Sequence, residues 1–141
     1  MATPVYESVY ESVYEAGPQS GQHPGGARWE TLALRFLKKR GLTLQQQNYR
    51  CPVGEIDLVM MDGKTLVFVE VRYRRSGTFG GGVESVDSRK QFRLAKVASH
   101  FLQRHSAFSR TPCRFDVVAI SGTTDDPGIN WIAHAFEDPR G

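Results

Sequence analysis

The chain lacks the features that mark several large classes of protein. Its two cysteines, Cys51 and Cys113, have neither C-x-x-C spacing nor paired histidines, which argues against a zinc site and excludes a disulfide framework. No apolar run approaches the roughly 20 residues needed to cross a bilayer, so no membrane span is expected. The N-terminus lacks the basic and apolar regions of a secretory signal. We therefore expect a cytoplasmic protein with reduced thiols.

Basic residues are absent from residues 1–26, which carry only the acids Glu7, Glu11 and Glu15 and repeat Val-Tyr-Glu-Ser. This low-complexity segment has too little apolar content to fold alone, so we predict a disordered arm. The remaining residues, 27–141, suit one α/β domain with a single core. Without the arm, 18 basic side chains stand against 12 acidic ones, a net charge of +6.

The positive charge is concentrated in one stretch. Residues 71–114 contain ten Lys and Arg residues, with Glu84 and Asp87 as the two acids. Such a stretch favours a phosphate backbone as partner. On charge alone, a basic face that is merely solvated is the stronger alternative.

Apolar spacing predicts the first half of the domain. Ala33, Phe36 and Leu37 lie at helical spacing, and Gly41 follows as the stop signal. Extended runs follow at residues 44–49, 56–61 and 65–73, and the Asp62-Gly63 turn between the last two is typical of a two-residue hairpin. We expect these runs to form an antiparallel meander.

The second half predicts a crossover. A Gly-rich loop at residues 77–82 leads to a helix that begins near Asp87 or Ser88, either of which can cap it. Two more strands are expected at residues 114–120 and 129–136. The order strand, helix, strand predicts that the fourth strand runs parallel to the third. The predicted fold is α/β: a mixed five-stranded sheet flanked by helices.

Carboxylates occupy positions where core-facing residues should be apolar. Asp57 stands in the second run and Glu70 in the third, where Glu70 and Arg72 share a face because strand side chains alternate. Asp57 can join them across the hairpin. Glu30 falls on the buried stripe of the first helix, or else it begins that helix, since acids in the first turn complement the helix dipole. We predict that the three carboxylates converge.

Buried carboxylates need cations or hydrogen bonds to offset their loss of hydration. Mg²⁺ or Mn²⁺ is the natural partner, because such a hard cation takes one or two carboxylates and leaves other positions to water and phosphate. Asp57, Glu70 and the backbone carbonyl of Val71 would form such an open shell. A metal site of this kind can hydrolyse phosphodiester bonds.

Several segments together carry a resemblance: Gly54-Glu55-Ile56-Asp57-Leu58-Val59, residues 67–74 (Val-Phe-Val-Glu-Val-Arg-Tyr-Arg), Phe79-Gly80, Lys90-Gln91 and residues 114–118. In order and spacing the chain resembles the YraN-like family of predicted endonucleases, within the restriction-endonuclease-like superfamily and similar to archaeal Holliday-junction resolvases. The resemblance implies that fold, a DNA substrate that includes branched structures, and a homodimer, since such resolvases work as dimers. It also implies that Glu30, Asp57 and Glu70 are the metal-binding acids and that Lys90 and Gln91 are the polar pair on the following helix.

One position departs from the family pattern, which has lysine where this chain has Arg72. Lysine can release a proton when its pKa falls, whereas arginine stays charged and acts only as a donor and electrostatic stabiliser. If catalysis needs only charge stabilisation, Arg72 is sufficient. Lys90 could replace the lysine, because helical phase puts it on the sheet-facing side of the second helix. The alternative is a non-catalytic nucleic-acid-binding module in which Arg72 has cost the chain its activity.

The remaining polar residues divide into two groups. We expect Asp116, Trp29, Trp131 and His134 to be structural, with Asp116 paired to an arginine. Phosphate contact is the preferred role for the arginines after Glu70. The basic residues of the second helix either form a solvent-exposed face or face a groove of the nucleic acid. The predicted nucleic-acid-binding residues are Arg74, Arg75, Arg89, Arg93 and Lys96.

Overall fold

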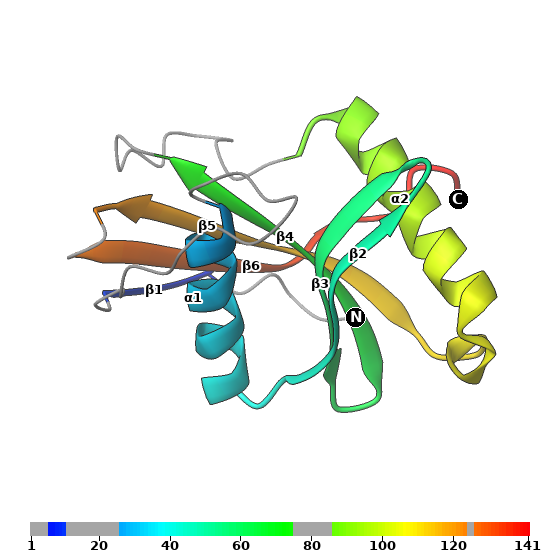
Figure 1. Ribbon diagram of the computed structural model, residues 1–141, viewed down its shortest axis with the longest axis horizontal. Coiled ribbons are helices and arrows are strands. Elements are labelled where there is room, and N and C mark those ends of the chain that lie inside the picture. The colour runs from blue at the N-terminus through cyan, green and yellow to red at the C-terminus, as the bar shows by residue number, and fades with distance from the viewer. Residues whose placement is uncertain (1–5, 11–25, 75–85, 124–125) are drawn as a thin grey trace.

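The computed structural model describes residues 6–10, 26–74, 86–123 and 126–141. All strands belong to one six-stranded sheet in the order β1-β6-β5-β4-β3-β2, flanked by two helices (Figure 1). The elements are β1 (Tyr6–Tyr10), α1 (Gly26–Lys39), β2 (Thr43–Cys51), β3 (Gly54–Asp62), β4 (Thr65–Arg74), α2 (Ser88–Arg104), the short 3-10 helix η1 (Ser106–Phe108), β5 (Cys113–Gly122) and β6 (Pro127–Phe136). No helix in these ranges is long and apolar enough to cross a membrane.

The predicted α/β topology is confirmed. β2, β3 and β4 form the antiparallel meander, and β4 pairs in parallel with β5 after the crossover through α2. β6 returns antiparallel to β5. The hairpin turn lies one residue later than predicted: Asp62 pairs with Thr65, so Gly63 and Lys64 form the loop, and Gly63 takes a positive φ of 60°. The predicted Gly-rich loop at residues 77–82 lies outside the described residues.

A sixth strand comes from the segment that we predicted to be disordered. β1 pairs antiparallel with β6, from Tyr6 opposite Ile132 to Tyr10 opposite Gly128. Composition indicates whether a segment can fold alone, and this one cannot, but the edge of β6 offers unpaired backbone groups. Tyr and Val are good strand formers, so five residues can add to an existing edge. Strand β1 at Tyr6–Tyr10 was not among the predicted elements.

Both helices end or begin at the predicted signals. Gly41 has a φ of 95°, and the Leu42 N–H donates to the Leu37 carbonyl at 3.2 Å, which closes the last turn of α1. At the start of α2, Asp87 is the cap: its Oδ1 accepts from the Lys90 N–H at 2.9 Å. This cap fixes the first turn of α2, which carries Lys90.

The sheet separates two apolar cores. α1 contributes Leu32 and Phe36 to the core on one face, and α2 contributes Leu94 and Phe101 to the core on the other. β4 is buried on both faces, because its residues alternate between the two cores: Val67 and Val69 belong to the α1 core, Leu66 and Phe68 to the α2 core. Most of β4 therefore cannot move without disturbing both layers.

One buried carboxylate ties β5 to β6. Asp116 is only 1% exposed and accepts from Arg114 Nε, Trp131 Nε1 and the His134 backbone N–H, each at 2.9 Å. The β5–β6 register shifts between Phe115 and Val117, and His134 takes a positive φ of 55°. The carboxylate thus satisfies an amide at an irregular point of the sheet, and the predicted arginine partner of Asp116 is present.

We expect Asp116→Ala to destabilise the fold by about 3–5 kcal/mol, because Trp131 Nε1 and the His134 N–H lose their acceptor and Arg114 keeps only Asp62 as its ion-pair partner. Urea unfolding followed by circular dichroism measures this change. Asp126→Ala, at the exposed position just before β6, is the control and should change stability by less than about 0.5 kcal/mol. An Asp116→Ala variant as stable as the control would contradict this role.

Candidate metal and active site

The candidate site lies where β3 and β4 separate. Their ladder runs from Asp62 opposite Thr65 to Leu58 opposite Val69 and stops there. Asp57 and Glu70 would be the next pair. Instead, the Val71 backbone N–H donates to Asp57 Oδ2 at 2.8 Å. A carboxylate thus takes the place of a strand carbonyl at the point where the ladder between the two strands ends.

A local kink turns Asp57 toward this gap. Ile56 packs in the α2 core and Leu58 in the α1 core, although residues two apart in a regular strand face the same way. The opposite position in β2 is Asn48, which has a positive φ of 56°. Asparagine tolerates this conformation better than most residues, because its short amide can bond locally. Both strands of the hairpin therefore change face at Asp57.

Glu30 reaches Asp57 from α1. It is 6% exposed, and its carboxyl is hydrogen-bonded to the side chains of Asp57 and Asn48. Two ionised carboxylates can only accept, so a bond between Glu30 and Asp57 requires one proton. α1 has no acid in its first turn, so the interpretation of Glu30 as a helix-starting acid is wrong. It contacts Asp57 from the α1 side.

The electrostatics of the site favour protonated carboxyls. Burial raises the pKa of Asp57 well above its usual range, and the charges of Glu70 and Glu30 raise it further, against the opposing hydrogen bond from the Val71 amide. Burial likewise raises the pKa of Glu30, and its hydrogen bonds to Asp57 and Asn48 oppose that shift. The site concentrates negative charge that a cation would stabilise.

Glu70 and Lys90 complete the site from the α2 side. Glu70 follows Phe68 on the face of β4 that α2 covers, and Lys90 Nζ lies 2.5 Å from Glu70 Oε2. The sequence-based placement of Lys90 near the carboxylates agrees with this contact. An open pocket of about 280 Å³ lies here, lined by Gly54, Glu55, Asp57, Glu70, Val71, Lys90, Arg93 and Leu94.

The donors at this pocket fit a divalent cation. Asp57 and Glu70 supply carboxylate oxygens from opposite strands. The amide and carbonyl of a strand residue point to the same side, so the Val71 carbonyl faces the β3 side, as its amide does. Among the described residues no three Asp, Glu, His or Cys side chains form a group that could hold a metal ion, so the predicted convergence of Glu30, Asp57 and Glu70 as a three-acid metal group is wrong. The donors that remain are two carboxylates and a backbone carbonyl, and Mg²⁺ usually takes only one or two carboxylates.

Other predicted site residues lie apart from this pocket. Gln91 donates from its side-chain amide to the Val86 carbonyl at 2.7 Å, so it holds the segment before α2 and does not line the pocket. Arg72 lies two residues beyond Glu70 on β4, opposite Ala119 of β5. Arg74 is at the end of the same strand. Arg75 and the Phe79-Gly80 segment lie outside the described residues.

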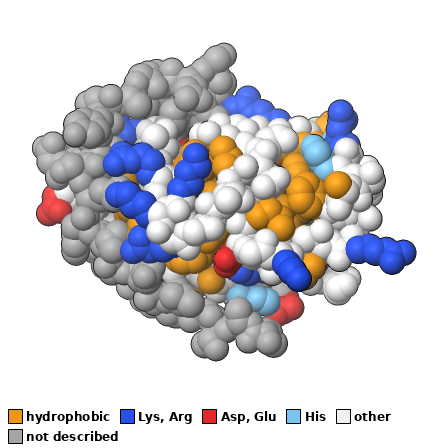
Figure 2. Space-filling model, turned by 90° about the horizontal axis from the view of Figure 1, so that it is seen from below, with side chains coloured by type: hydrophobic (Ala, Val, Ile, Leu, Met, Phe, Trp, Pro, Cys, Tyr) orange, Lys and Arg blue, Asp and Glu red, His pale blue; other side chains and the backbone are white. Residues whose placement is uncertain are grey.

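Basic side chains gather in two regions. Arg89, Arg93 and Lys96 are exposed on α2, and Arg93 also lines the pocket. Figure 2 views the molecule from below, where α1 ends, and shows a second group of basic side chains; Lys38 and Lys39 belong to the last turn of α1. The α2 group adjoins the carboxylates, which favours it as the phosphate-binding surface.

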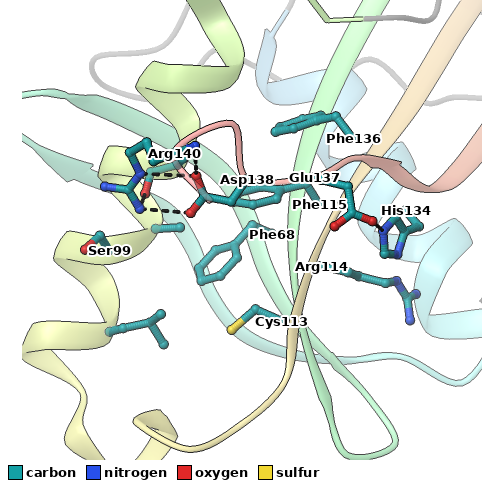
Figure 3. Close-up of a pocket in the computed structure, with 13 residues that line it drawn as sticks. Phe68, Ser99, Cys113, Arg114, Phe115, His134, Phe136, Glu137, Asp138 and Arg140 are labelled. Atoms are coloured by element: carbon teal, nitrogen blue, oxygen red, sulfur yellow. Dashed lines mark hydrogen bonds and ion pairs between the residues drawn. The ribbon is translucent and has the colours of Figure 1, made fainter. Parts of the chain in front are cut away.

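A second pocket, of about 240 Å³, lies between α2, β5 and the C-terminal segment (Figure 3). Four of its ionisable side chains pair with each other: Arg140 with Asp138 at 3.0 Å, and His134 with Glu137 at 2.6 Å. None of the predicted site residues lines it. These pairs leave the β3–β4 gap as the stronger candidate site.

Comparison with known proteins identifies the family. The model of the uncharacterised protein family UPF0102 matches residues 29–120. The chain belongs to the UPF0102 family. A UPF0102 protein of Stutzerimonas stutzeri is 52% identical over 118 residues, covering 84% of this chain and 98% of that protein. UPF0102 proteins of Pseudomonas savastanoi pv. phaseolicola and Nitrosococcus oceani are 50% and 49% identical, covering 85% and 79% of this chain and 98% and 90% of theirs.

UPF0102 is the YraN-like family that the motifs resemble, so the predicted family is confirmed. The family is described as uncharacterised, and its activity must be argued from the site. The UPF0102 match covers all three acids and Asn48, a residue that sequence reasoning missed. Its one signal was an asparagine at the end of the polar run Gln45-Gln46-Gln47, where a strand kink is best tolerated.

The raised pKa values predict a pH-dependent stability for this UPF0102 protein. A carboxyl with a raised folded pKa contributes stability that is fully present below its unfolded pKa, 3.8 for Asp57, and is lost as the pH rises through the folded pKa. Asp57→Asn removes this dependence and keeps an acceptor for the Val71 N–H. In metal-free buffer at pH 7 we expect its Tm to exceed that of the wild type by a few degrees, since 1 kcal/mol corresponds to roughly 3 °C.

The gain should shrink as the pH falls toward 3.8, which scanning calorimetry across pH would detect. Asp62→Asn, at the exposed end of the same strand, is the matched control and should show no gain. A Tm for Asp57→Asn below that of the wild type at pH 7 would contradict the predicted burial of excess charge.

Proposed function

We propose that this protein is a Mg²⁺- or Mn²⁺-dependent endonuclease that hydrolyses phosphodiester bonds in DNA, branched structures included. The observation that carries the proposal is the meeting of Asp57, Glu70 and the Val71 backbone where β3 and β4 separate, beside Lys90. A fold that needed these strands only for stability would continue the ladder with apolar residues. The donor set matches metal-assisted hydrolysis.

Each residue has a distinct part in this proposal. A bound divalent cation supplies a water of lowered pKa and counter-charge for the phosphodiester. Asp57 and Glu70 hold that cation with the Val71 carbonyl, and Glu30 keeps Asp57 oriented through their hydrogen bond. The Val71 N–H fixes Oδ2 of Asp57, so the carboxylate keeps one orientation.

Lys90 supplies the positive charge closest to the carboxylates. Its ammonium contacts Glu70 Oε2, and a four-carbon stem lets it move toward a bound phosphate. Arg93 lines the same pocket and can donate to a second phosphate, and Arg89 and Lys96 are exposed on the same helix. Together these cations extend the site into a track for a polyanion.

The first test is cleavage of a labelled DNA panel (single strand, duplex, flap, four-way junction) with Mg²⁺ or Mn²⁺. We expect Asp57→Asn and Glu70→Gln to lower the cleavage rate by at least about 10²-fold, because each removes a negative ligand without changing shape. Asp62→Asn, a matched aspartate of β3 outside the pocket, should cleave like the wild type.

Binding of the cation has its own readout. Mn²⁺ at about 100 times its Kd should stabilise the wild type by roughly 2.7 kcal/mol, and this gain should be lost in Glu70→Gln. Cleavage that survives both site substitutions, or a gain in Tm that Glu70→Gln retains, would contradict the assignment of these ligands.

A second candidate function is a non-catalytic nucleic-acid-binding module of the same fold. Arg72 favours it, because arginine at this position cannot transfer a proton. The two functions predict different cleavage rates when Arg72 is replaced by the lysine of the family pattern.

Under the nuclease proposal, Lys90→Ala lowers cleavage by about 10²-fold, since it removes the cation at Glu70. Arg72→Lys raises cleavage in the Lys90→Ala background, because a proton-releasing group returns to β4. Single-turnover rates on the preferred DNA measure both effects, with Lys64→Ala at the exposed β3–β4 turn as the control. An unchanged rate in Lys90→Ala would remove that residue from the site, and activity that appears only with Arg72→Lys would favour the binding module.

A further inference from the structure

Phe92 on α2 is an aromatic side chain left in solvent. Among the described residues, the exposed large hydrophobic side chains are Phe92 and Val53, each 44% exposed. The ring of Phe92 takes part in no aromatic or cation–π contact with another described residue. The other described phenylalanines each contact a further ring: Phe36, Phe68, Phe101, Phe108, Phe115 and Phe136.

The neighbours of Phe92 on the helix surface are cations. Arg89 precedes it by three residues, Lys96 follows it by four and Arg93 is the next residue, and all three side chains are exposed. Residues three and four apart are neighbours on a helix. The core face of α2 lies elsewhere, at Leu94, Val97 and the following buried residues. Phe92 therefore stands within a basic stripe.

This stripe borders the carboxylate pocket. Arg93 lines that pocket, and its side chain packs against Gly54 at the start of β3, where a Cβ would lie 3.2 Å from Arg93 Cδ. Figure 1 shows the β2–β3 hairpin reaching the first half of α2. Phe92 is thus one residue from the pocket rim and on the outer side of Arg93.

A single exposed phenylalanine is ordinary on a protein surface, so the charges around it must decide its partner. An apolar protein partner would bury Arg89 and Lys96 without compensation, whereas a polyanion satisfies them. Base pairs in a duplex hide their faces in the stack. An unpaired nucleotide offers both a phosphate for the cations and an aromatic face for the ring.

We propose that Phe92 is a base-stacking residue of the site, and that with Arg89 and Lys96 it binds an unpaired nucleotide next to the phosphate to be cleaved. The substrate class is DNA in which a single-stranded segment adjoins a duplex, as in a flap or fork. This inference rests on the proposed function, since it uses the same pocket. Arg93 links the stacked nucleotide to the carboxylates.

The test measures binding by fluorescence anisotropy in Ca²⁺, with a flap and a blunt duplex of equal length, the flap carrying 2-aminopurine at successive unpaired positions. Phe92→Ala should weaken flap binding about tenfold, the loss expected for one stacked base, and leave duplex binding unchanged. The wild type should quench one 2-aminopurine position, and Phe92→Ala should abolish that quenching.

Matched variants separate stacking from apolar contact and from charge. Phe92→Leu keeps apolar area without a π-face and should behave like Phe92→Ala, whereas Phe92→Trp should retain the preference for the flap. Lys96→Ala should weaken both DNAs and lower the salt dependence of binding. Lys64→Ala, at the exposed turn far from α2, should change neither.

Equal effects of Phe92→Ala on flap and duplex, no effect on either, or full rescue by Phe92→Leu would overturn the stacking role. So would a change of sedimentation coefficient in Phe92→Ala, which would make the ring a protein contact. If Asp57-dependent cleavage persists in any of these cases, the inference alone fails. Quenching that depends on Phe92 in a protein that never cleaves would keep the inference and remove the nuclease, whereas a wild type that binds no DNA would overturn both.

Discussion

The hydrogen bond from the Val71 amide to Asp57 is the interaction on which the candidate site depends. A buried backbone N–H must find an acceptor, and in a continued ladder that acceptor would be a carbonyl of β3. Because the Asp57 carboxylate accepts this hydrogen bond, the pairing of β3 with β4 can end here while the Val71 N–H keeps an acceptor. The pocket lined by Asp57, Glu70 and Val71 lies at this separation, and there Lys90 contacts Glu70.

In two places of the sheet an aspartate side chain accepts a hydrogen bond from a backbone amide, but the charges around the two aspartates differ. Asp116 accepts from the His134 amide at the β5–β6 irregularity, as Asp57 accepts from Val71. Arg114 neutralises Asp116 through two hydrogen bonds, so that carboxylate is complete within the fold. Asp57 instead faces Glu70 and Glu30, and its pKa is raised first by desolvation and then by the charges of these two acids. Of these two aspartates, only the one with excess negative charge around it has a reason to bind a cation.

The sequence predicted what local periodicity controls. The meander and the parallel crossover follow from apolar spacing and turn signals, and acids inside apolar runs located Asp57 and Glu70. β1 escaped prediction because Tyr6–Tyr10 gains its structure from the β6 edge, which composition does not reveal. The Asn48 kink and the turn of Gln91 toward Val86 also depend on tertiary contacts. A resemblance could supply the residue types at the site but not these orientations.

The Gly54-Glu55-Ile56-Asp57 segment joins the two sides of the site. Gly54 lies against Arg93 and Val97, so a side chain there would require Arg93 to shift. This close contact holds the first half of α2 against the start of β3, three residues before Asp57. The same half of α2 carries Lys90, so hairpin packing sets the distance between that cation and the carboxylates. Lys90 can therefore stay next to Glu70 only while the β2–β3 hairpin and α2 remain packed together. Gly54 thus affects the geometry of the candidate site without contacting substrate.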